Sequence, residues 1–108
     1  MFARSISVRL KPNTVAEFTQ LIENESLPVL RKQKGFQDEI TFVAPGGAEA
    51  LAISLWDKKE NAETYGRDSY PAVLKTLSNV LEGNPQVRTY EVCNSTFHHV
   101  AAQVAVHN

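Results

Sequence analysis

Cysteine is nearly absent from this sequence of 108 residues, in which Cys93 is the only one. A single cysteine excludes an internal disulfide and a metal site built from several thiolates. The simplest location for such a chain is a reducing cytoplasm, which we expect here. A lone cysteine usually behaves as a small apolar residue, so we expect Cys93 to lie in the core.

The sequence also lacks a strong charge and a long apolar run. It has 11 Lys and Arg against 12 Asp and Glu, which gives a net charge of −1. This balance provides no electrostatic attraction to nucleic acid or to an anionic membrane, and we expect neither as a partner. No apolar run approaches the ~20 residues that cross a bilayer, and the first residues lack the layout of a signal peptide.

The common catalytic motifs are missing as well. The sequence has no Ser-His-Asp spacing, no glycine-rich phosphate loop and no HExxH pattern. We also find no internal repeat and no low-complexity segment. The residues therefore predict the architecture better than they predict the chemistry.

What the sequence does contain is a strand without charge on either face, within residues 49–56. Leu51, Ile53 and Leu55 share one face, while the other carries small residues and one aromatic residue, namely Ala50, Ala52, Ser54 and Trp56. A strand of this kind is usually covered on both sides, so we expect it to be central in a sheet. Some other part of the structure must then cover its second face.

The residues before this strand predict a strand, a helix and an edge strand. Residues 2–10 alternate, with Arg4 interrupting an otherwise apolar face. Residues 14–17 form a capping box, and Pro28 should kink or break the helix that follows. Residues 36–43 alternate as an edge strand, whose apolar face we expect to hold Phe36, Ile40 and Phe42.

The residues after the central strand predict two helices and a last strand. Asp57 is placed to cap the first helix, which should end at Gly66. Ser69 is placed to cap the second helix, with Pro71 in its first turn. The last strand is expected over 87–97. This divides the chain into a single domain and a C-terminal tail, residues 1–97 and 98–108.

The predicted order of elements is β-α-β-β-α-α-β, which is the split βαβ or ferredoxin-like plan of the α+β class. Right-handed crossovers place all helices on one face of a four-stranded antiparallel sheet. The other face would be a large exposed apolar patch if nothing covered it. We expect a second copy of the chain to do so in a symmetric homodimer.

Two short motifs accompany this strand order. The second strand starts with a glycine and an aromatic residue in Lys34-Gly35-Phe36, and the third ends with a Trp before a polar helix in Trp56-Asp-Lys-Lys-Glu60. With these features, residues 2–95 resemble the antibiotic biosynthesis monooxygenase-type domains of the dimeric α+β barrel superfamily. The resemblance implies a dimer whose two sheets face each other and a pocket in each subunit between sheet and helices. Members include cofactor-independent oxygenases of quinols and polyketide aromatics, and haem-degrading enzymes.

The resemblance argues against the haem-degrading branch. That branch carries an Asn on the first strand, a Trp on the helix after the third strand and, further on, a His that ligates iron. Alignment on Trp56 places Ile6, Tyr65 and Lys75 at these three positions. A protonated lysine has no lone pair for iron, so we expect no haem, and we expect no metal or other cofactor.

Four residues are candidates for binding a substrate, namely Ile6, Trp56, Tyr65 and Tyr70. Trp56 would stack on a flat ligand, although a core Trp that joins strand to helix is the alternative. The phenol of Tyr65 lies at a pocket position of the family, and Tyr70 either joins it or is only the first apolar contact of its helix. We expect a cavity with room for one or two fused rings, and a lid that moves at Gly66.

Two further side chains carry predictions. His98 is a candidate base at the mouth of the pocket, because histidine titrates near neutral pH, although an exposed position is the alternative. His98 and His99 are adjacent and cannot form a metal site together on a strand. Arg4 requires a carboxylate or a ligand anion, and Glu91 is a candidate partner.

Two functional hypotheses follow. The first is a cofactor-independent monooxygenase acting on a small aromatic or quinol-type molecule, with Tyr65 and His98 as catalytic candidates. In that chemistry the substrate anion itself reduces oxygen, and the protein supplies an apolar pocket that excludes water. The second is a non-catalytic dimeric module that binds a small apolar molecule. The resemblance favours the first hypothesis, and the lack of a strong acid–base pair favours the second.

Overall fold

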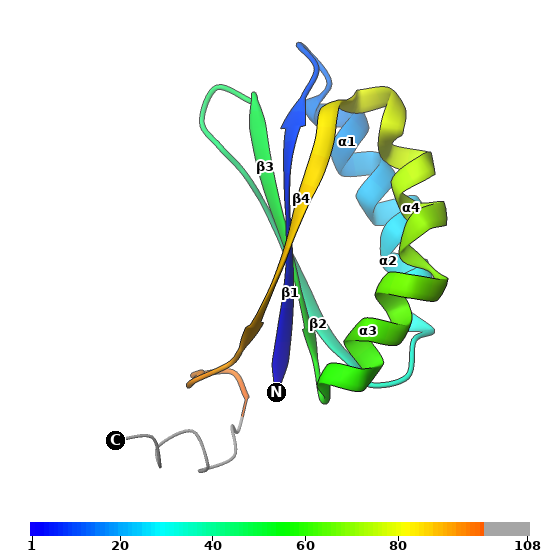
Figure 1. Ribbon diagram of the computed structural model, residues 1–108. Coiled ribbons are helices and arrows are strands. Elements are labelled where there is room, and N and C mark those ends of the chain that lie inside the picture. Colours follow the sequence, from blue (N-terminus) through cyan, green and yellow to red (C-terminus); the bar gives the residue numbers. More distant parts are fainter. Residues whose placement is uncertain (99–108) are drawn as a thin grey trace.

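A four-stranded antiparallel sheet and one layer of helices make up the structure, a computed structural model that describes residues 1–98 (Figure 1). In chain order the elements are β1 (Phe2–Leu10), α1 (Val15–Leu21), a π-helical segment (Ile22–Ser26), α2 (Leu27–Arg31), β2 (Phe36–Val43), β3 (Glu49–Trp56), α3 (Lys59–Asp68), α4 (Tyr70–Leu77), a 3₁₀ turn (Ser78–Val80) and β4 (Leu81–Glu91). The predicted β-α-β-β-α-α-β order is therefore confirmed.

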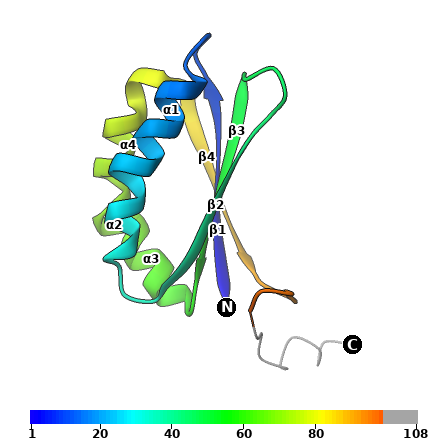
Figure 2. The same cartoon turned by 180° about the vertical axis from the view of Figure 1, so that it is seen from behind.

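The strands have the order β2-β3-β1-β4, so β1 and β3 are central and β2 and β4 are edges. All three neighbouring pairs are antiparallel. Every helix of residues 1–98 lies on one face of the sheet, and none of them lies over the opposite face, here called the open face (Figures 1 and 2). The predicted ferredoxin-like plan, the central position of β3 and the edge position of β2 are confirmed.

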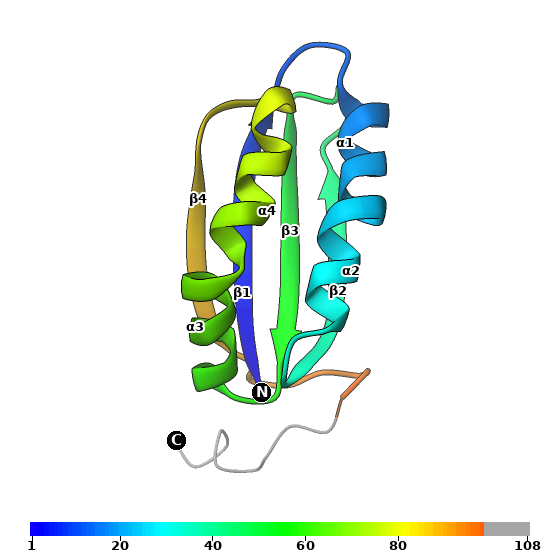
Figure 3. The same cartoon turned by 90° about the vertical axis from the view of Figure 1, so that its right-hand side faces the viewer.

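The core between the sheet and the helices has two parts. An aliphatic part is built around Val8, Phe18 and Leu77, and an aromatic part around Trp56 and Tyr65. Helices α1 and α2 lie over the β2 side of the sheet, while α3 and α4 lie toward β1 and β4 (Figure 3). Full burial of one large apolar side chain contributes about 1.5–3 kcal/mol, so both parts hold the helices on the sheet.

Pro28 interrupts the first helical region, as predicted. Helix α1 passes into the π-helical segment 22–26, and α2 then starts with the proline in its first turn. Proline lacks an N–H and clashes with the preceding turn, and a π-helical turn accommodates such a disruption. The predicted capping box does not form, because the Thr14 hydroxyl donates to the Lys11 carbonyl at 2.7 Å and no side chain caps α1.

A bulge in β2 changes which of its residues face the helices. Phe36 pairs with Trp56, and the register shifts by one residue directly after this pair. Phe36 and Glu39 consequently lie on the helix-facing side, whereas Ile40 and Phe42 lie on the open face. The predicted common face for Phe36, Ile40 and Phe42 is wrong, because strict alternation leaves no place for an extra residue.

The first helix after β3 is longer than predicted. Helix α3 continues through Gly66 and ends at Asp68, since a single glycine inside a helix costs only about 1 kcal/mol. The Asp57 carboxylate does not cap it and instead accepts a hydrogen bond from the Asn61 side chain at 2.8 Å. The break before α4 occurs at Ser69, whose side chain forms no capping bond.

The last strand lies nearer the N-terminus than predicted. Strand β4 ends at Glu91, so the predicted strand over 87–97 is only partly formed. Gly83, with a φ of +73°, lies within this strand. Cys93 follows the strand and is exposed, which contradicts its predicted place in the core.

No helix among residues 1–98 is long and apolar enough to cross a membrane. The predictions for the tail beyond His98, which include His99 and His107, lie outside the described residues.

Candidate ligand site

A cavity of about 40 Å³ lies between the helix-facing side of the sheet and the helices. Its apolar wall is formed by Ile6, Val8, Phe18, Ile22, Leu30, Ala52, Val73, Leu74, Leu77, Leu81 and Pro85. Its polar lining is formed by Ser26, Glu39, Ser54, Tyr65 and Tyr70. Small-molecule sites typically have this composition, in which apolar walls surround a few polar groups.

The cavity is small. A volume of about 40 Å³ exceeds the ~15 Å³ that one water requires but is far below the ~150 Å³ of a cavity that admits benzene. The predicted room for one or two fused rings is therefore not present. Among the helical residues of the wall, only Tyr70 and Leu74 are half-buried, so they are the parts of the helix layer that can move outward at least cost to the core.

The structure brings three of the four predicted binding residues together, since Ile6, Tyr65 and Tyr70 all line the cavity. Trp56 does not line it and has no exposed surface. The Trp56 ring centroid lies 5.2 Å from that of Tyr65, and its indole N–H donates to the Ser54 hydroxyl at 2.9 Å. Trp56 thus has the core position that the alternative interpretation described, with its polar atom satisfied.

Tyr65 is almost completely buried, and burial raises the pKa of its phenol to about 12, with the Arg4 charge opposing this shift. Burial likewise raises the pKa of Tyr70, again against the effect of Arg4. Both phenols are consequently protonated at neutral pH. They can donate hydrogen bonds to a ligand, but they are poor bases.

Two hydroxyl groups in the cavity wall lack a partner among residues 1–98. They are the Ser26 Oγ and the Tyr70 Oη, and both atoms are buried. A buried hydroxyl without a partner costs about 1–3 kcal/mol. A water or a ligand oxygen in the cavity would satisfy them.

Arg4 lies beneath the two tyrosines of the site. Only 6% of its surface is exposed, and its guanidinium carbon is 4.2 Å from the Tyr70 ring centroid and 5.4 Å from that of Tyr65. Gly66 permits this approach, because a Cβ there would lie 3.3 Å from two guanidinium nitrogens. The predicted partner Glu91 is exposed, and Arg4 forms no ion pair within residues 1–98, so that pairing is wrong.

Glu39 was missed by the sequence interpretation. The bulge in β2 turns it toward the helices, where it lines the cavity and accepts a hydrogen bond from the Thr41 hydroxyl. Burial raises the pKa of Glu39, and the bond from Thr41 partly opposes this. The sequence carries one signal for this placement. Glu39 and Val43 are four residues apart and therefore lie on the same side of a strand, and Val43 packs on the aliphatic core.

His98 and Tyr65 are not brought together. His98 lies on the open face, beside Ile40 and Leu55, and its Nε2 is hydrogen bonded to an Asp38 carboxylate oxygen. The cavity with Tyr65 is on the other side of the sheet. A role for His98 as base therefore stays a prediction to which this position gives no support.

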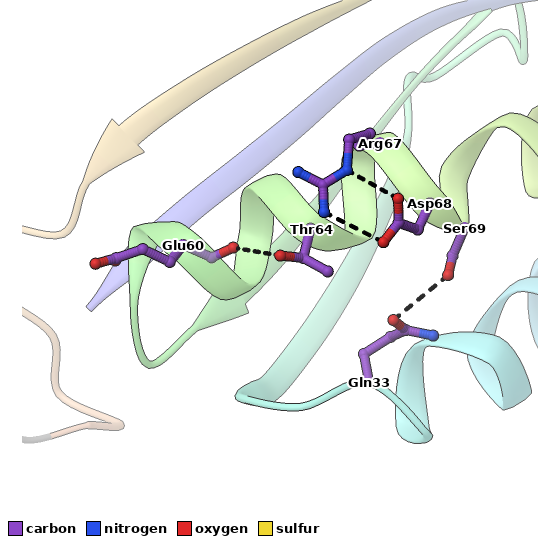
Figure 4. A network of polar contacts seen from close by, with 6 residues as sticks. All are labelled: Gln33, Glu60, Thr64, Arg67, Asp68 and Ser69. Carbon is purple, nitrogen blue, oxygen red and sulfur yellow. Dashed lines mark hydrogen bonds and ion pairs between the residues drawn. The ribbon is translucent and has the colours of Figure 1, made fainter.

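The junction of α3 and α4 is tied to the first helical region. The Ser69 hydroxyl donates to the Gln33 side-chain oxygen at 3.4 Å, and the Gln33 amide donates to the Val29 carbonyl at 3.0 Å (Figure 4). Gly66 lies inside α3 rather than between two helices. The predicted lid hinged at this glycine is therefore absent from the structure, and the interruption that exists is at Ser69.

Lys75, predicted to replace an iron ligand, is exposed on α4 and does not line the cavity. Across residues 1–98, no group of three or more His, Cys, Asp or Glu side chains is arranged to hold a metal ion.

No family model and no curated protein matches this chain. Several solved structures match its fold. A monooxygenase from the gene ActVA-Orf6 of Streptomyces coelicolor, in complex with nanaomycin D, has a TM-score of 0.73 and 18% identity over 87% of this chain and 88% of its own. SnoaB of Streptomyces nogalater, a cofactor-independent oxygenase, has a TM-score of 0.71 and 10% identity over 88% and 95%.

A protein of unknown function from Nitrosomonas europaea, NE2512, has a TM-score of 0.73 and 12% identity over 92% of this chain and 95% of its own. Another matching structure is named an antibiotic biosynthesis monooxygenase, with a TM-score of 0.69 and 12% identity. At such low identity the likeness shows the fold alone. The fold implied by the sequence resemblance is thereby confirmed.

Proposed function

We propose that this chain is a monooxygenase-like protein that acts on a small hydroxylated aromatic or quinol-type molecule without a bound cofactor. The observation that carries the proposal is the cavity between sheet and helices, whose wall contains the unpartnered hydroxyls of Ser26 and Tyr70. Two fold neighbours that act as oxygenases support it.

In this reaction the ionised substrate would itself reduce oxygen. The aliphatic wall would exclude water, and the protonated Tyr65 and Tyr70 would donate hydrogen bonds to the substrate oxygen. Glu39 is the acidic residue of the cavity lining and would take up the proton. Binding requires the half-buried Tyr70 and Leu74 to move outward.

Oxygen consumption with a panel of quinols and hydroxylated aromatic compounds tests the proposal. We expect consumption above the rate of air oxidation for at least one compound. The matched control is Ala52→Leu, which adds volume on the cavity floor and should abolish it. Rates that are the same with this variant, or with no protein, would contradict an oxygenase site in the cavity.

The second candidate function is a non-catalytic module that binds a small apolar molecule. It is favoured by the absence of a ready base among the predicted residues, since Tyr65 is protonated and His98 is on the open face. Binding of a compound, detected by quenching of Trp56 fluorescence, without oxygen consumption would select this function.

We also propose that the chain forms a homodimer through its open face. Ile40, Phe42 and Tyr90 are about half exposed there. Ile40 and Phe42 pair with Ile53 and Leu51 of β3. Tyr90 pairs with the small Ala3 of β1, which pairs with Leu55 of β3, so these residues form an apolar surface across the sheet. A second copy offers the same apolar surface and would cover it around a two-fold axis. Sedimentation at micromolar concentration should give the mass of a dimer, and a monomer would contradict the proposal.

Two further proposals come from the sequence. A reducing cytoplasm is the proposed location, since the free Cys93 is exposed.

Haem is not a proposed ligand, because Ile6, Tyr65 and Lys75 occupy the positions that hold Asn, Trp and His in the haem-degrading branch. Titration with haem should leave the Soret band without the shift that iron ligation causes, and a sharp ligated spectrum would contradict this.

A further inference from the structure

Two charged side chains lie in one row across the helix-facing side of the sheet. Ser54 of β3 is the register partner of Arg4 on β1 and of Glu39 on β2. Residues in one row across a sheet project to the same side, and neighbouring strands are about 4.8 Å apart. The backbones at Arg4 and Glu39 are therefore about 10 Å apart, with the small Ser54 between them.

Neither charge is paired within residues 1–98. Arg4 is 6% exposed, and its Nη1 has no hydrogen-bond partner. Glu39 is bonded to the neutral Thr41 hydroxyl. A buried charge without a partner is strongly destabilising, so the buried Arg4 and the half-buried Glu39 cost stability where they stand, and a ligand between them would offset part of that cost.

The groups around this row are those of the candidate site. Tyr65, Tyr70 and Glu39 line the cavity, and both tyrosine rings lie against the Arg4 guanidinium. The two phenols are the titratable groups that act on Arg4, and Glu39 in turn acts on Tyr65. Arg4 does not itself line the cavity, so it acts on a ligand through the field that it creates there.

We propose that this row ionises a phenolic ligand, with Glu39 as proton acceptor and Arg4 as the positioning charge that stabilises the anion. The ligand O–H bond breaks, its electron pair stays on the ligand oxygen, and the proton forms an O–H bond with the Glu39 carboxylate. The site carries the same net charge before and after the transfer. This inference rests on the proposed function, because it requires a hydroxylated aromatic in the cavity.

The substrate class follows from the same charges. Both groups strengthen the binding of a neutral phenol, because the phenol transfers its proton to Glu39 and its negative charge then lies in the field of Arg4. A ligand that enters already charged meets the ionised Glu39, and a ligand without an acidic hydroxyl gains nothing from the row. The site therefore selects aromatic compounds with a weakly acidic hydroxyl.

The test uses 4-nitrophenol and nitrobenzene, two probes of nearly the same size of which only the first ionises. The ionised and neutral forms of 4-nitrophenol absorb at different wavelengths, so the state of the bound probe can be read directly. Measurements are made below the pKa of the free probe, in weak buffer with a pH indicator. Wild-type protein should bind 4-nitrophenol as the anion and release no proton, because Glu39 retains it.

Three variants separate the two roles. Arg4→Met should weaken binding of 4-nitrophenol about tenfold, which is the effect of a unit charge about 10 Å away at an effective dielectric constant of about 20. It should leave nitrobenzene binding unchanged, and Arg4→Lys should recover part of the loss. Glu39→Gln should still bind the anion but release one proton to the buffer for each probe bound.

Thermal melts and circular dichroism establish that each variant is folded, and the proton count with Glu39→Gln does not depend on Arg4→Met folding. Equal proton release by wild type and Glu39→Gln would overturn the role of Glu39. A neutral bound probe, or equal loss of both probes in Arg4→Met, would overturn the role of Arg4. Failure of the wild type to bind either probe would overturn the inference as a whole. Binding with the predicted proton count but without oxygen consumption would contradict only the proposed oxygenase function.

Discussion

The two faces of the sheet are similarly apolar but differ in what covers them. On β3, the side with Ala50, Ser54 and Trp56 is buried beneath the helices. The side with Leu51 and Ile53 is only partly buried, and no helix covers it. The covered side carries small side chains near its centre, which leave space for a cavity. The open face carries the larger aliphatic side chains of β3, and its hollows lie at the surface, one beside Phe42 and Leu51 and one beside Ile40 and Leu55.

Polar groups distinguish the faces as well. The covered side holds Arg4, Glu39 and the unpartnered hydroxyl of Tyr70 close to a cavity. On the open face, β2 and β3 contribute aliphatic and aromatic side chains, and β1 contributes the small Ala3, Ser5 and Ser7. A buried polar group costs free energy unless it is used or satisfied, so the covered side is suited to a ligand and the open face to a protein surface.

The largest effect is expected on assembly through the open face. Ile53→Asp would place a charge in the centre of the proposed dimer interface, and an unpaired buried charge costs about 3–5 kcal/mol. We expect dissociation to increase more than about a hundredfold in sedimentation experiments. The control Ala72→Asp, on the exposed surface of α4, should leave the mass unchanged. A monomeric wild type, or an Ile53→Asp variant that remains a dimer, would contradict the proposal that the open face is the dimer interface.

The same substitution on each face gives the next effect. Phe18 is 2% exposed on the covered side and Phe42 is 49% exposed on the open face. Phe18→Ala should lower the free energy of unfolding by about 3–5 kcal/mol in urea denaturation. Phe42→Ala should cost less than about 1 kcal/mol in dilute solution, where the monomer dominates. A cost for Phe42→Ala that rises with protein concentration would show that the open face is covered in the dimer.

A smaller effect is expected at alkaline pH and belongs to the covered side. The pKa of Tyr65 is about 12, above the ordinary value of 10.0, so the folded state holds this proton more tightly than the unfolded state. Its contribution is complete below pH 10 and is lost as the pH rises toward 12, by roughly 3 kcal/mol in all. The free energy of unfolding can be measured by urea denaturation between pH 9 and about 12. It should fall with rising pH more steeply in the wild type than in Tyr65→Phe. Equal slopes would show that the phenol is not buried in solution.

Much of the fold could be predicted because alternation and chain breaks are local features. The uncharged β3, the alternating β1 and the interruption at Pro28 each determine an element without reference to distant residues. The errors arose where contacts between residues distant in the sequence determine the local structure. Helix α3 continues through Gly66, where Arg4 occupies the space that a side chain would need.

The site was less predictable for the same reason. Ile6, Tyr65 and Tyr70 were placed at one cavity by family resemblance, and they do line it. Glu39 was missed because the helix-facing side of β2 was assigned from Phe36, and the bulge after Phe36 places this residue on the side opposite Ile40 and Phe42. The volume of the cavity depends on how neighbouring side chains fill the space between layers, which a sequence pattern does not specify.

The smallest effect separates a ligand contact from a structural wall. Tyr65→Phe removes only a hydroxyl, and loss of a neutral hydrogen bond to a ligand oxygen should weaken binding by about 0.5–1.5 kcal/mol, or roughly two- to tenfold. Titration of nitrobenzene, whose nitro oxygens accept a hydrogen bond and which does not ionise, measures this change. Tyr90→Phe is the matched control, because Tyr90 is half exposed on the open face and should have no effect. If Tyr65→Phe binds the probe as the wild type does, Tyr65 is only part of the wall, and the hydrogen bond to the ligand must come from Tyr70 or Ser26.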